Sequence, residues 1–351
     1  MNDFVIPYLK TLSLSPEIQE TPIYFLDHWK TPKDYFYIRN HFAYPQLNIH
    51  QSVLAIGGNV KNPLKLTLNE LIYLPSKTIL VPLECAGNNR AKFKPEVYGE
   101  QWEQGAISQG KWKGVPLRDL LKKAELLEGS KEAVFVGMDF GERKDFEESF
   151  HYGRSLPIEK ALHEDTIVAY EYNGKPIPYK HGFPLRLIVP GWYAMASVKW
   201  LQNIFIIRHE FNGPFQTKDY VYYPYQDSDK DKKPVTAISV NSTIQQPMNY
   251  SILAEGNHLI YGIAWTGIGT IKKVEISFDH GNTWKETSLK FKEDEKYAWV
   301  KWKFVWRADK GDHSIFIRAS DTEGNVQPLR PFWNRKGYGY NAIQKIKVKV
   351  E

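Results

Sequence analysis

The chain has 351 residues, 42% of them hydrophobic and 25% charged, a composition typical of a globular protein with about two domains. A single cysteine, Cys85, excludes an intrachain disulfide, zinc sites of the paired Cys-x-x-Cys kind and cysteine-ligated iron–sulfur clusters. The net charge of +6, from 46 basic and 40 acidic residues, is dispersed and favours small anions over nucleic acid. The N-terminus lacks a basic start before an apolar run, and no stretch approaches ~20 apolar residues, so we expect a cytoplasmic protein without a membrane span.

Residues up to about 225 mix short apolar strands with helical segments, which predicts an α+β domain. Leucines at helical spacing around Pro116 predict a helix over residues 115–124. The pair Asn173-Gly174 is a hairpin turn signal. Apolar runs predict strands at 78–82, 133–138, 166–172 and 185–189.

A polar run at 227–233 is too charged to bury and predicts an exposed linker. We therefore expect two domains, at residues 1–228 and 229–351. Beyond the linker the pattern is strand-like almost throughout, and turns recur at intervals typical of a sandwich. The second domain is predicted to be an immunoglobulin-like β-sandwich with strands at 258–265, 271–278, 299–306 and 314–319.

Cys85 follows the first of the predicted strands and precedes Ala86-Gly87-Asn88-Asn89-Arg90. Free cysteine often acts as a small buried hydrophobe, so mere filling of the core is one interpretation. The alternative is a soft-metal ligand or a nucleophile, because Gly87 permits unusual backbone angles and the next three side chains can direct donors at an anion. The residues of this segment favour the second interpretation over the first.

Three further clusters place polar or cationic side chains near predicted strands. They are Tyr37-Ile38-Arg39-Asn40-His41, His181-Gly182-Phe183-Pro184-Leu185-Arg186 and Ser197-Val198-Lys199-Trp200. Guanidinium groups bind oxyanions through two parallel hydrogen bonds, and histidine and lysine add donors. Each cation taken singly is more often a surface charge, but an unpaired charge beside the apolar strand at 185–189 would be unfavourable.

These clusters, in this order, resemble the sulfite oxidase family of molybdenum enzymes, in its haem-free bacterial type. The similarity runs from Tyr37 nearly to the C-terminus. In the first domain it rests on Arg39-Asn40-His41, Cys85-Ala86-Gly87-Asn88, the segment from His181 to Arg186 with Val189-Pro190-Gly191, and Ser197-Val198-Lys199-Trp200. In the second domain it rests on 274–279, Asn325-Val326-Gln327-Pro328 and Trp333-Asn334. The resemblance implies a mixed α/β molybdopterin-binding domain followed by a β-sandwich.

The resemblance also implies a molybdenum ion held by the dithiolene of a molybdopterin, with Cys85 as the one protein thiolate ligand. No haem is expected in this chain. The positions that match the family's pterin pocket are Tyr37, Ile38, Arg39, Asn40, His41, Asp139, His181, Arg186, Ser197, Val198 and Lys199. Cations among them suit the phosphate of this cofactor, and amides suit its heterocycle.

Five positions match the family's catalytic and substrate residues, namely Arg39, Arg90, Trp102, Tyr220 and Lys336. Tyr220 matches a tyrosine that donates a hydrogen bond near the metal. Lys336 stands where vertebrate and plant members have an arginine. Lysine keeps the charge but lacks the planar fork, which implies weaker binding of a tetrahedral anion or a different substrate.

The activity implied is oxidation of sulfite to sulfate with electrons passed to an external acceptor such as a cytochrome. The alternative is a related nitrate or S-/N-oxide reductase, and a protein that has lost its cofactor and only binds partners is disfavoured. The resemblance also implies a homodimer formed through residues after about 235. Trp265, Trp299, Trp302 and Trp306 are candidates for that interface, although the sandwich core is the more usual place for them.

Overall fold

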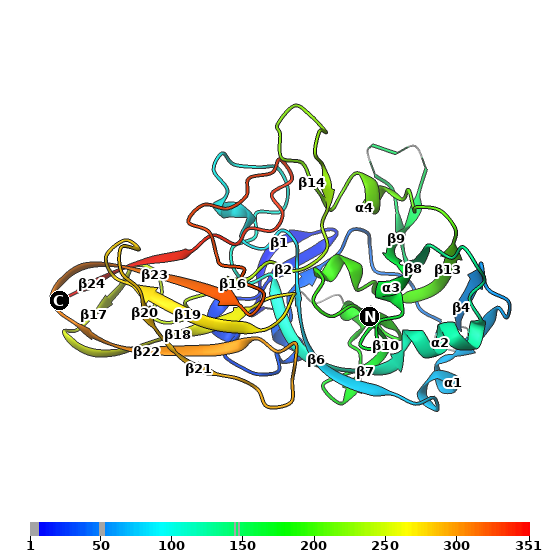
Figure 1. Ribbon diagram of the computed structural model, residues 1–351, viewed down its shortest axis with the longest axis horizontal. Coiled ribbons are helices and arrows are strands. Elements are labelled where there is room, and N and C mark those ends of the chain that lie inside the picture. The colour runs from blue at the N-terminus through cyan, green and yellow to red at the C-terminus, as the bar shows by residue number, and fades with distance from the viewer. Residues whose placement is uncertain (1–6, 49–52, 144, 147) are drawn as a thin grey trace.

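The structure is a computed structural model that describes residues 7–48, 53–143, 145–146 and 148–351. The first six residues, which contributed to the cytoplasmic prediction, lie outside the described residues. A sheet-rich part on the right of Figure 1 joins an elongated β-sandwich on the left, which carries the C-terminus. Among the described residues, no helix is long and apolar enough to cross a membrane.

In the described residues, three sheets of three or more strands build the first part. One has the order β1 (Lys10–Leu14), β2 (Glu17–Glu20), β3 (Ile38–Arg39). A second has the order β11 (Lys175–Pro176), β10 (Ile167–Tyr172), β7 (Ile107–Pro116), β6 (Lys77–Glu84), with β12 (Arg186–Ile188) also paired to β10. The third has the order β5 (Leu64–Thr67), β4 (Val53–Gly58), β13 (Leu201–Ile207), β8 (Glu132–Gly141), β9 (Phe150–Pro157). The last six residues of β6 are all buried, so this strand lies within the core.

Four short α-helices cover these sheets in the described part: α1 (Leu68–Ile72), α2 (Leu117–Ala124), α3 (Ile158–Ala161) and α4 (Pro214–Thr217). In α2 the buried residues Leu117, Leu120, Leu121 and Ala124 follow helical spacing and form one apolar face. The predicted helix therefore exists but begins two residues late, because Val115 and Pro116 still pair within β7. The four predicted strands are present as β6, β8, β10 and β12.

Two sheets make the second part. The first has the order β16 (Asn241–Ser242), β18 (Gly256–Trp265), β22 (Val300–Ala308), β21 (Ser288–Lys290). The second has the order β17 (Ser251–Leu253), β24 (Gln344–Val350), β23 (Gly311–Asp321), β19 (Ile271–Ser277), β20 (Lys285–Glu286). Residues of β24 alternate strictly between buried and exposed, as expected when one face of a strand packs on a core. The sandwich is confirmed; its immunoglobulin-like character stays a prediction.

The predicted linker at 227–233 is exposed along its whole length. Its last residue belongs to β15 (Lys233–Pro234), which returns to pair with β14 (Val221–Tyr222). The linker is therefore the turn of a hairpin as well as a connection. The boundary between residues 228 and 229 stays a prediction.

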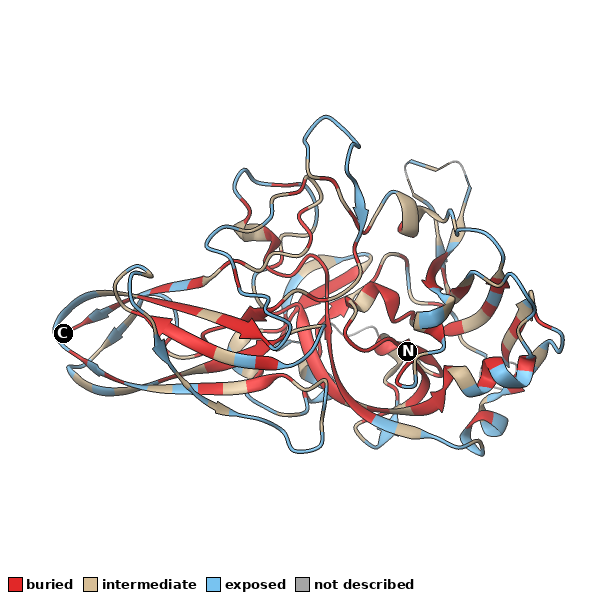
Figure 2. Ribbon diagram, in the orientation of Figure 1, coloured by how far each residue is buried: buried red, intermediate tan, exposed pale blue. Residues whose placement is uncertain are grey.

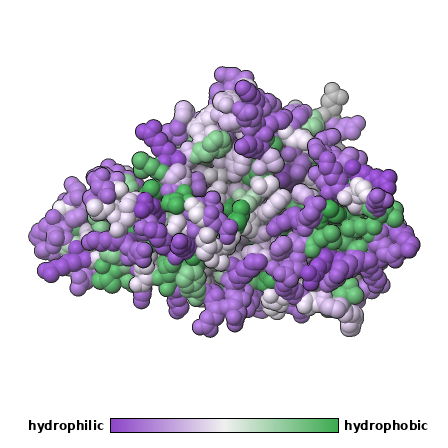
Figure 3. Space-filling model, viewed as in Figure 1, coloured by the Kyte–Doolittle hydropathy of each residue, from purple (hydrophilic) through white to green (hydrophobic). Residues whose placement is uncertain are grey.

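The four tryptophans considered for a dimer interface are all buried within this chain. Trp265 and Trp299 pack in the large core of the first part, and Trp302 and Trp306 pack in the sandwich core. The prediction that these tryptophans form the dimer interface is therefore wrong, and they pack in the cores of the chain. Figure 2 shows the buried residues concentrated where the sandwich meets the strands of the first part. Most of the face seen in Figure 3 is polar, with small scattered apolar patches.

Candidate active site

Cys85 lies directly after β6, and its side chain is buried. Its backbone N–H donates to the carbonyl oxygen of Ala106 at 2.8 Å, and its own carbonyl accepts from the N–H of Asn88 at 2.9 Å. Burial raises the pKa of the thiol, while the positive charges of Arg39 and Arg90 act in the opposite direction. A thiolate at this position is therefore favoured by a further cation at the sulfur, such as a metal ion.

The residue before Cys85 ties this loop to the second domain. Glu84 accepts one hydrogen bond from the Nδ2 of Asn88 at 2.9 Å and another from the Nε1 of Trp265 at 2.8 Å. The Oδ1 of Asn88 in turn accepts from the N–H of Ala106 at 3.1 Å. Burial raises the pKa of Glu84 to about 7. This network has no local signal in the sequence, because Glu84 and Trp265 are 181 positions apart.

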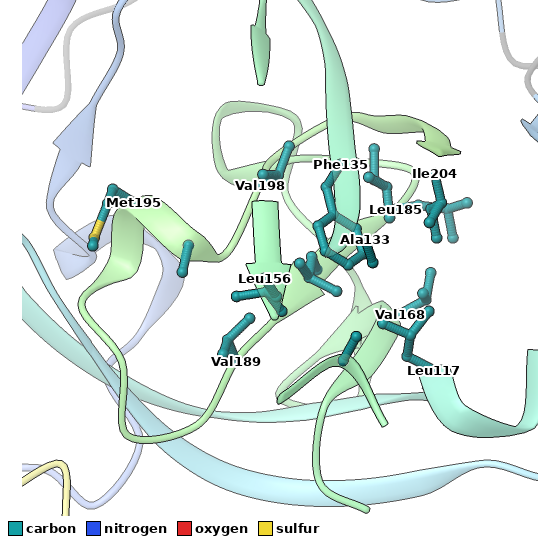
Figure 4. Close-up of a cluster of buried hydrophobic side chains, with 14 of the residues drawn as sticks. Leu117, Ala133, Phe135, Leu156, Val168, Leu185, Val189, Met195, Val198 and Ile204 are labelled. Atoms are coloured by element: carbon teal, nitrogen blue, oxygen red, sulfur yellow. The ribbon is translucent and has the colours of Figure 1, made fainter. Parts of the chain in front are cut away.

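A pocket is lined in part by Cys85, and we call it the inner pocket. Its walls come from the four clusters recognised in the sequence, together with strand residues behind them. Met195 and Val198 belong both to this wall and to the buried hydrophobic cluster of Figure 4, so the pocket is built on the core. The lining residues are Phe36, Tyr37, Arg39, Asn40, His41, Cys85, Ala86, Asp139, Tyr152, His181, Arg186, Ala194, Met195, Ser197, Val198, Lys199 and Tyr220.

The inner pocket holds buried cations whose partners are neutral. Arg186 donates from Nε to the carbonyl oxygen of Ser197 at 3.2 Å and from Nη1 to that of His181 at 3.0 Å. Burial lowers the pKa of Arg186 to about 10. The Nζ of Lys199 donates to the side-chain oxygen of Asn40. Within the described residues the hydrogen-bond partners of Arg186 are main-chain carbonyl groups, so its charge is available for an anion. Burial lowers the pKa of Lys199 well below its usual value, while the charge of Asp139 acts in the opposite direction.

Asp139, on β8, is the one buried acid of the inner pocket wall in the described part of the chain. Its Oδ1 has no hydrogen-bond partner among the described residues. Burial raises the pKa of Asp139 to about 6, and the charge of Lys199 acts in the opposite direction. Buried polar atoms are almost always paired, so this oxygen suits an N–H donor on a bound group.

A second pocket also reaches Cys85, and we call it the outer pocket. It is lined by Pro16, Arg39, His41, Cys85, Arg90, Tyr98, Gly99, Glu100, Arg143, Phe215, Asp219, Tyr220, Lys336 and Tyr338. Arg39, His41, Cys85 and Tyr220 line both pockets and therefore form the junction between them. A group bound in the inner pocket at Cys85 is thus accessible from the outer pocket.

At this junction the hydroxyl of Tyr220 and the Nε2 of His41 form a hydrogen bond of 2.8 Å. Burial, followed by the charges of Arg39 and Lys199, lowers the pKa of His41 well below its usual value. The imidazole is therefore neutral near pH 7, and its Nε2 accepts or donates according to the tautomer. The resemblance placed Tyr220 near the metal and His41 at the cofactor; the structure joins the two side chains to each other.

Arg90 is held in a fixed position in the outer pocket. Its Nε donates to the carbonyl oxygens of Lys336 and Gly337 at 3.1 and 3.2 Å, and its Nη1 donates to that of Glu100 at 3.2 Å. A Cβ on Gly87 would lie 2.8 Å from the guanidinium carbon, so the glycine makes room for this side chain. The sequence predicted Arg90 as a substrate residue but not this cradle of main-chain atoms.

Lys336, the expected departure from the family pattern, is not an isolated charge. Its Nζ lies 3.3 Å from the Oδ1 of Asp219, whose Oδ2 accepts a hydrogen bond from the Nη1 of Arg143. Neither Asp219 nor Arg143 was identified from the sequence. The only local signal was that Asp219 precedes Tyr220; nothing in the pattern places Arg143 beside it.

Two predicted site residues line neither pocket. Ile38 is buried on β3, where it takes part in the pairing with β2. Trp102 is fully buried, and its ring packs edge-on against Tyr37 with centroids 6.0 Å apart. Trp102 therefore supports the wall behind Tyr37, and the prediction that it lines the substrate pocket is wrong for this structure. The remaining predicted residues lie in one or both pockets.

Comparison with known proteins finds two family models on this chain. An oxidoreductase molybdopterin-binding domain matches residues 41–215, and a Mo-co oxidoreductase dimerisation domain matches residues 232–351. The mitochondrial sulfite oxidases of Mus musculus and Homo sapiens are each 33% identical over 98% of this chain. A nitrate reductase [NADH] of Phaseolus vulgaris is 30% identical over 94% of this chain and 41% of its own length.

The chain spans 66% of the length of those mammalian sulfite oxidases. Among solved structures, the sulfane dehydrogenase SoxCD of Paracoccus pantotrophus is similar, with a TM-score of 0.83 and 28% identity. The match covers 96% of this chain and 85% of that chain. The similarity therefore extends over both domains.

The inner pocket fits a molybdopterin. Arg186, whose hydrogen-bond partners are main-chain carbonyl groups, offers the positive charge that a phosphate requires, and Lys199 adds a buried amine donor. The unpaired Oδ1 of Asp139 suits an N–H of the pterin heterocycle, and Cys85 supplies a buried sulfur at the pocket's open end. The two domain matches and the sequence identity to sulfite oxidases agree with these features of the pocket. The chain belongs to the sulfite oxidase family of molybdopterin-dependent oxidoreductases.

Proposed function

We propose that this chain oxidises sulfite to sulfate and passes the two electrons to an external acceptor such as a cytochrome. The observation that carries the proposal is the position of Cys85, between an inner pocket suited to an anionic cofactor and an outer pocket with four cationic side chains. The names of the relatives, sulfite oxidases and a sulfane dehydrogenase, support oxidised sulfur compounds as the substrate class.

In this proposal the inner pocket orients the cofactor. Arg186, His181 and Lys199 hold the phosphate end, Asp139 accepts a hydrogen bond from the heterocycle, and Cys85 is the protein ligand of molybdenum. When bound, the molybdenum centre supplies two-electron chemistry with transfer of an oxygen atom. The hydrophobic wall that includes Met195 and Val198 keeps the pocket rigid because it is part of the core.

The outer pocket is proposed to bind the substrate anion. Arg39 reaches both pockets, and the guanidinium of Arg90 is pre-organised by three carbonyl oxygens. Fixed donors that need no rearrangement bind an oxyanion more effectively than mobile ones, particularly where burial limits screening by water. Substrate would then lie against the face of Cys85 that opens outward.

The Tyr220–His41 pair is proposed to move protons at this junction. Conversion of sulfite and water into sulfate releases two protons and two electrons, so a proton acceptor beside the reacting atoms is required. A neutral imidazole bonded to a phenol can relay a proton through the hydroxyl to Nε2. Burial and the nearby positive charges, which lower the pKa of His41, also favour onward release of the proton.

We also propose that the protein is a cytoplasmic homodimer joined through residues after about 235. The match to a dimerisation domain over residues 232–351 supports the dimer, and light scattering at micromolar concentration should give twice the chain mass. A monomer would contradict the dimer, and fractionation of the source cell would test the location.

Two observations favour a second activity, reduction of nitrate or of an S- or N-oxide. Nitrate reductases are among the relatives at 30% identity, and Lys336 replaces the arginine expected from the family pattern. A substrate panel assayed in both redox directions separates this activity from sulfite oxidation.

Sulfite-dependent reduction of ferricyanide or a cytochrome by the purified protein tests the proposal. We expect turnover with sulfite that Cys85→Ser abolishes, and little reduction of nitrate or S-/N-oxides by artificial donors. Nitrate reduction without sulfite turnover would replace the proposal with the second activity. Turnover of neither substrate class would contradict both.

A further inference from the structure

Two cations from different domains bind one carboxylate in the outer pocket. Asp219 faces Lys336, which follows β23 in the second domain, and Arg143, which follows β8 in the first. Lys336 lies at 3.3 Å from Oδ1, and Arg143 binds Oδ2. The carboxylate therefore holds both cations at the pocket wall, and each cation limits how far the other can move.

The guanidinium plane of Arg143 is fixed by a second carboxylate. Its Nε and Nη2 donate to the two side-chain oxygens of Asp145 at 2.9 and 2.8 Å. Its centre also lies 5.3 Å from the ring of Phe215, which packs 4.5 Å from the ring of His41 at the junction. Arg143 thus belongs to the same packed unit as the junction.

Arg143 keeps donors for a ligand. A guanidinium has five N–H groups, and the bonds to Asp145 and Asp219 use three of them. One N–H therefore remains on each terminal nitrogen, next to a pocket in which Arg39, Arg90, Arg143 and Lys336 outnumber Asp219 and Glu100. The side chain is 20% exposed, so it is accessible to solutes in the pocket.

We propose that Arg143 is an anion-recognition residue of the outer pocket, supplying the planar guanidinium that Lys336 lacks, and that Asp219 positions both cations. The proposal deepens the proposed function and rests on it for the identity of the substrate. Planar, two-pronged donors match tetrahedral oxyanions, which an ammonium group binds only as a point charge. Substrate preference would then depend on a residue outside the family motifs.

The test compares Arg143→Gln, which removes the charge, with Arg143→Lys, which keeps it but removes the fork. Two quantities are measured on the holoenzyme: the KM for sulfite and the dissociation constant for inorganic sulfate by calorimetry. We expect Arg143→Gln to raise both on the order of tenfold, with kcat changed by less than about threefold, because a charged hydrogen bond to the bound anion is lost. Arg143→Lys should show a smaller rise in both constants.

Lys218→Gln is the matched control, because Lys218 is an exposed cation beside Asp219 that does not line the pocket. Circular dichroism establishes folding of each variant, and Arg143→Lys serves if Arg143→Gln does not fold. Values for the Arg143 variants within about twofold of Lys218→Gln would overturn the proposal. If wild-type protein binds sulfate through Arg143 but does not oxidise sulfite, the sulfite assignment fails while anion recognition by Arg143 stands.

Discussion

The inner and outer pockets meet at Cys85 but are assembled from the sequence in different ways. The inner pocket is lined by short contiguous motifs, such as the segment from His181 to Arg186. Residues from several of these motifs line the same pocket. The outer pocket depends on pairs between distant positions, such as Arg143 with Asp219 and Lys336 with Asp219. The comparison indicates that the segments of the inner pocket can be found from local motifs, whereas the ion pairs proposed to recognise an anion in the outer pocket join distant positions.

Cys85 lines both pockets, and we expect Cys85→Ser to have the largest effect on turnover. Replacing the thiolate by a hydroxyl removes the soft metal ligand, so turnover should fall by at least about a hundredfold. Ferricyanide reduction measures it, and circular dichroism checks that the fold is kept. Retention of wild-type turnover would mean that Cys85 is core filling after all.

Tyr220→Phe tests the proton path at the junction. Loss of the hydroxyl bonded to His41 should lower kcat on the order of a hundredfold with little change in KM, because acid–base assistance is lost. Tyr225→Phe is the matched control, since Tyr225 is exposed and its hydroxyl donates a hydrogen bond to the carboxylate of Asp231. Equal kcat for both variants would show that the Tyr220 hydroxyl takes no part in proton transfer.

Arg186→Gln sharpens the comparison between the pockets. Removing a buried cation from the inner pocket should weaken cofactor retention on the order of tenfold or more, measured as pterin content after dialysis. Arg143→Gln should retain its cofactor, because Arg143 lines only the outer pocket. Arg307→Gln, an exposed arginine in the sandwich, controls for the substitution itself. Equal cofactor loss from the inner-pocket and outer-pocket variants would show that cofactor binding is not specific to the inner pocket.

The smallest expected effect is on stability against pH. Burial, followed by the charge of Arg186, lowers the pKa of His181 well below 6.5. The unfolded chain therefore binds a proton near pH 6.5 before the folded one does, and this contribution to stability is present above pH 6.5 and lost as pH falls below it. Thermal unfolding of cofactor-free protein between pH 7.5 and 5.5 should show a shallower loss for His181→Gln than for wild type.

His209→Gln, at an exposed position, is the control for this pH series and should follow wild type. Three parallel curves would mean that His181 titrates alike in the folded and unfolded chains. The test compares only how thermal stability changes with pH. The absolute stability of His181→Gln is not compared, because the substitution also changes packing.

Sequence reasoning predicted the two-part architecture and most of the inner pocket because those features have local signals. Alternating residues predict sandwich strands, and the segments that carry Cys85, His181, Arg186 and Lys199 have their chemistry side by side in the chain. The long-range pairs have no such signal: Arg143 and Asp219 lie 76 positions apart, and Lys336 and Asp219 lie 117 apart.

Side-chain direction also limits what a sequence can predict. Trp102 follows the Cys85 loop, but only the fold reveals that its ring packs behind Tyr37 and not into the outer pocket. Ile38 has neighbours on both sides that line the inner pocket, yet alternation along β3 directs it into the core. Motif membership therefore located these segments correctly without establishing which of their residues contact a ligand.

The most direct test of the central claim is the molybdenum content of the wild-type protein, purified from a host that makes the cofactor. We expect one molybdenum per chain, held with a pterin in the inner pocket and released when the protein is unfolded. Protein that is folded, by circular dichroism, but contains no molybdenum would contradict the assignment of Cys85 as a metal ligand and, with it, the proposed oxidation of sulfite.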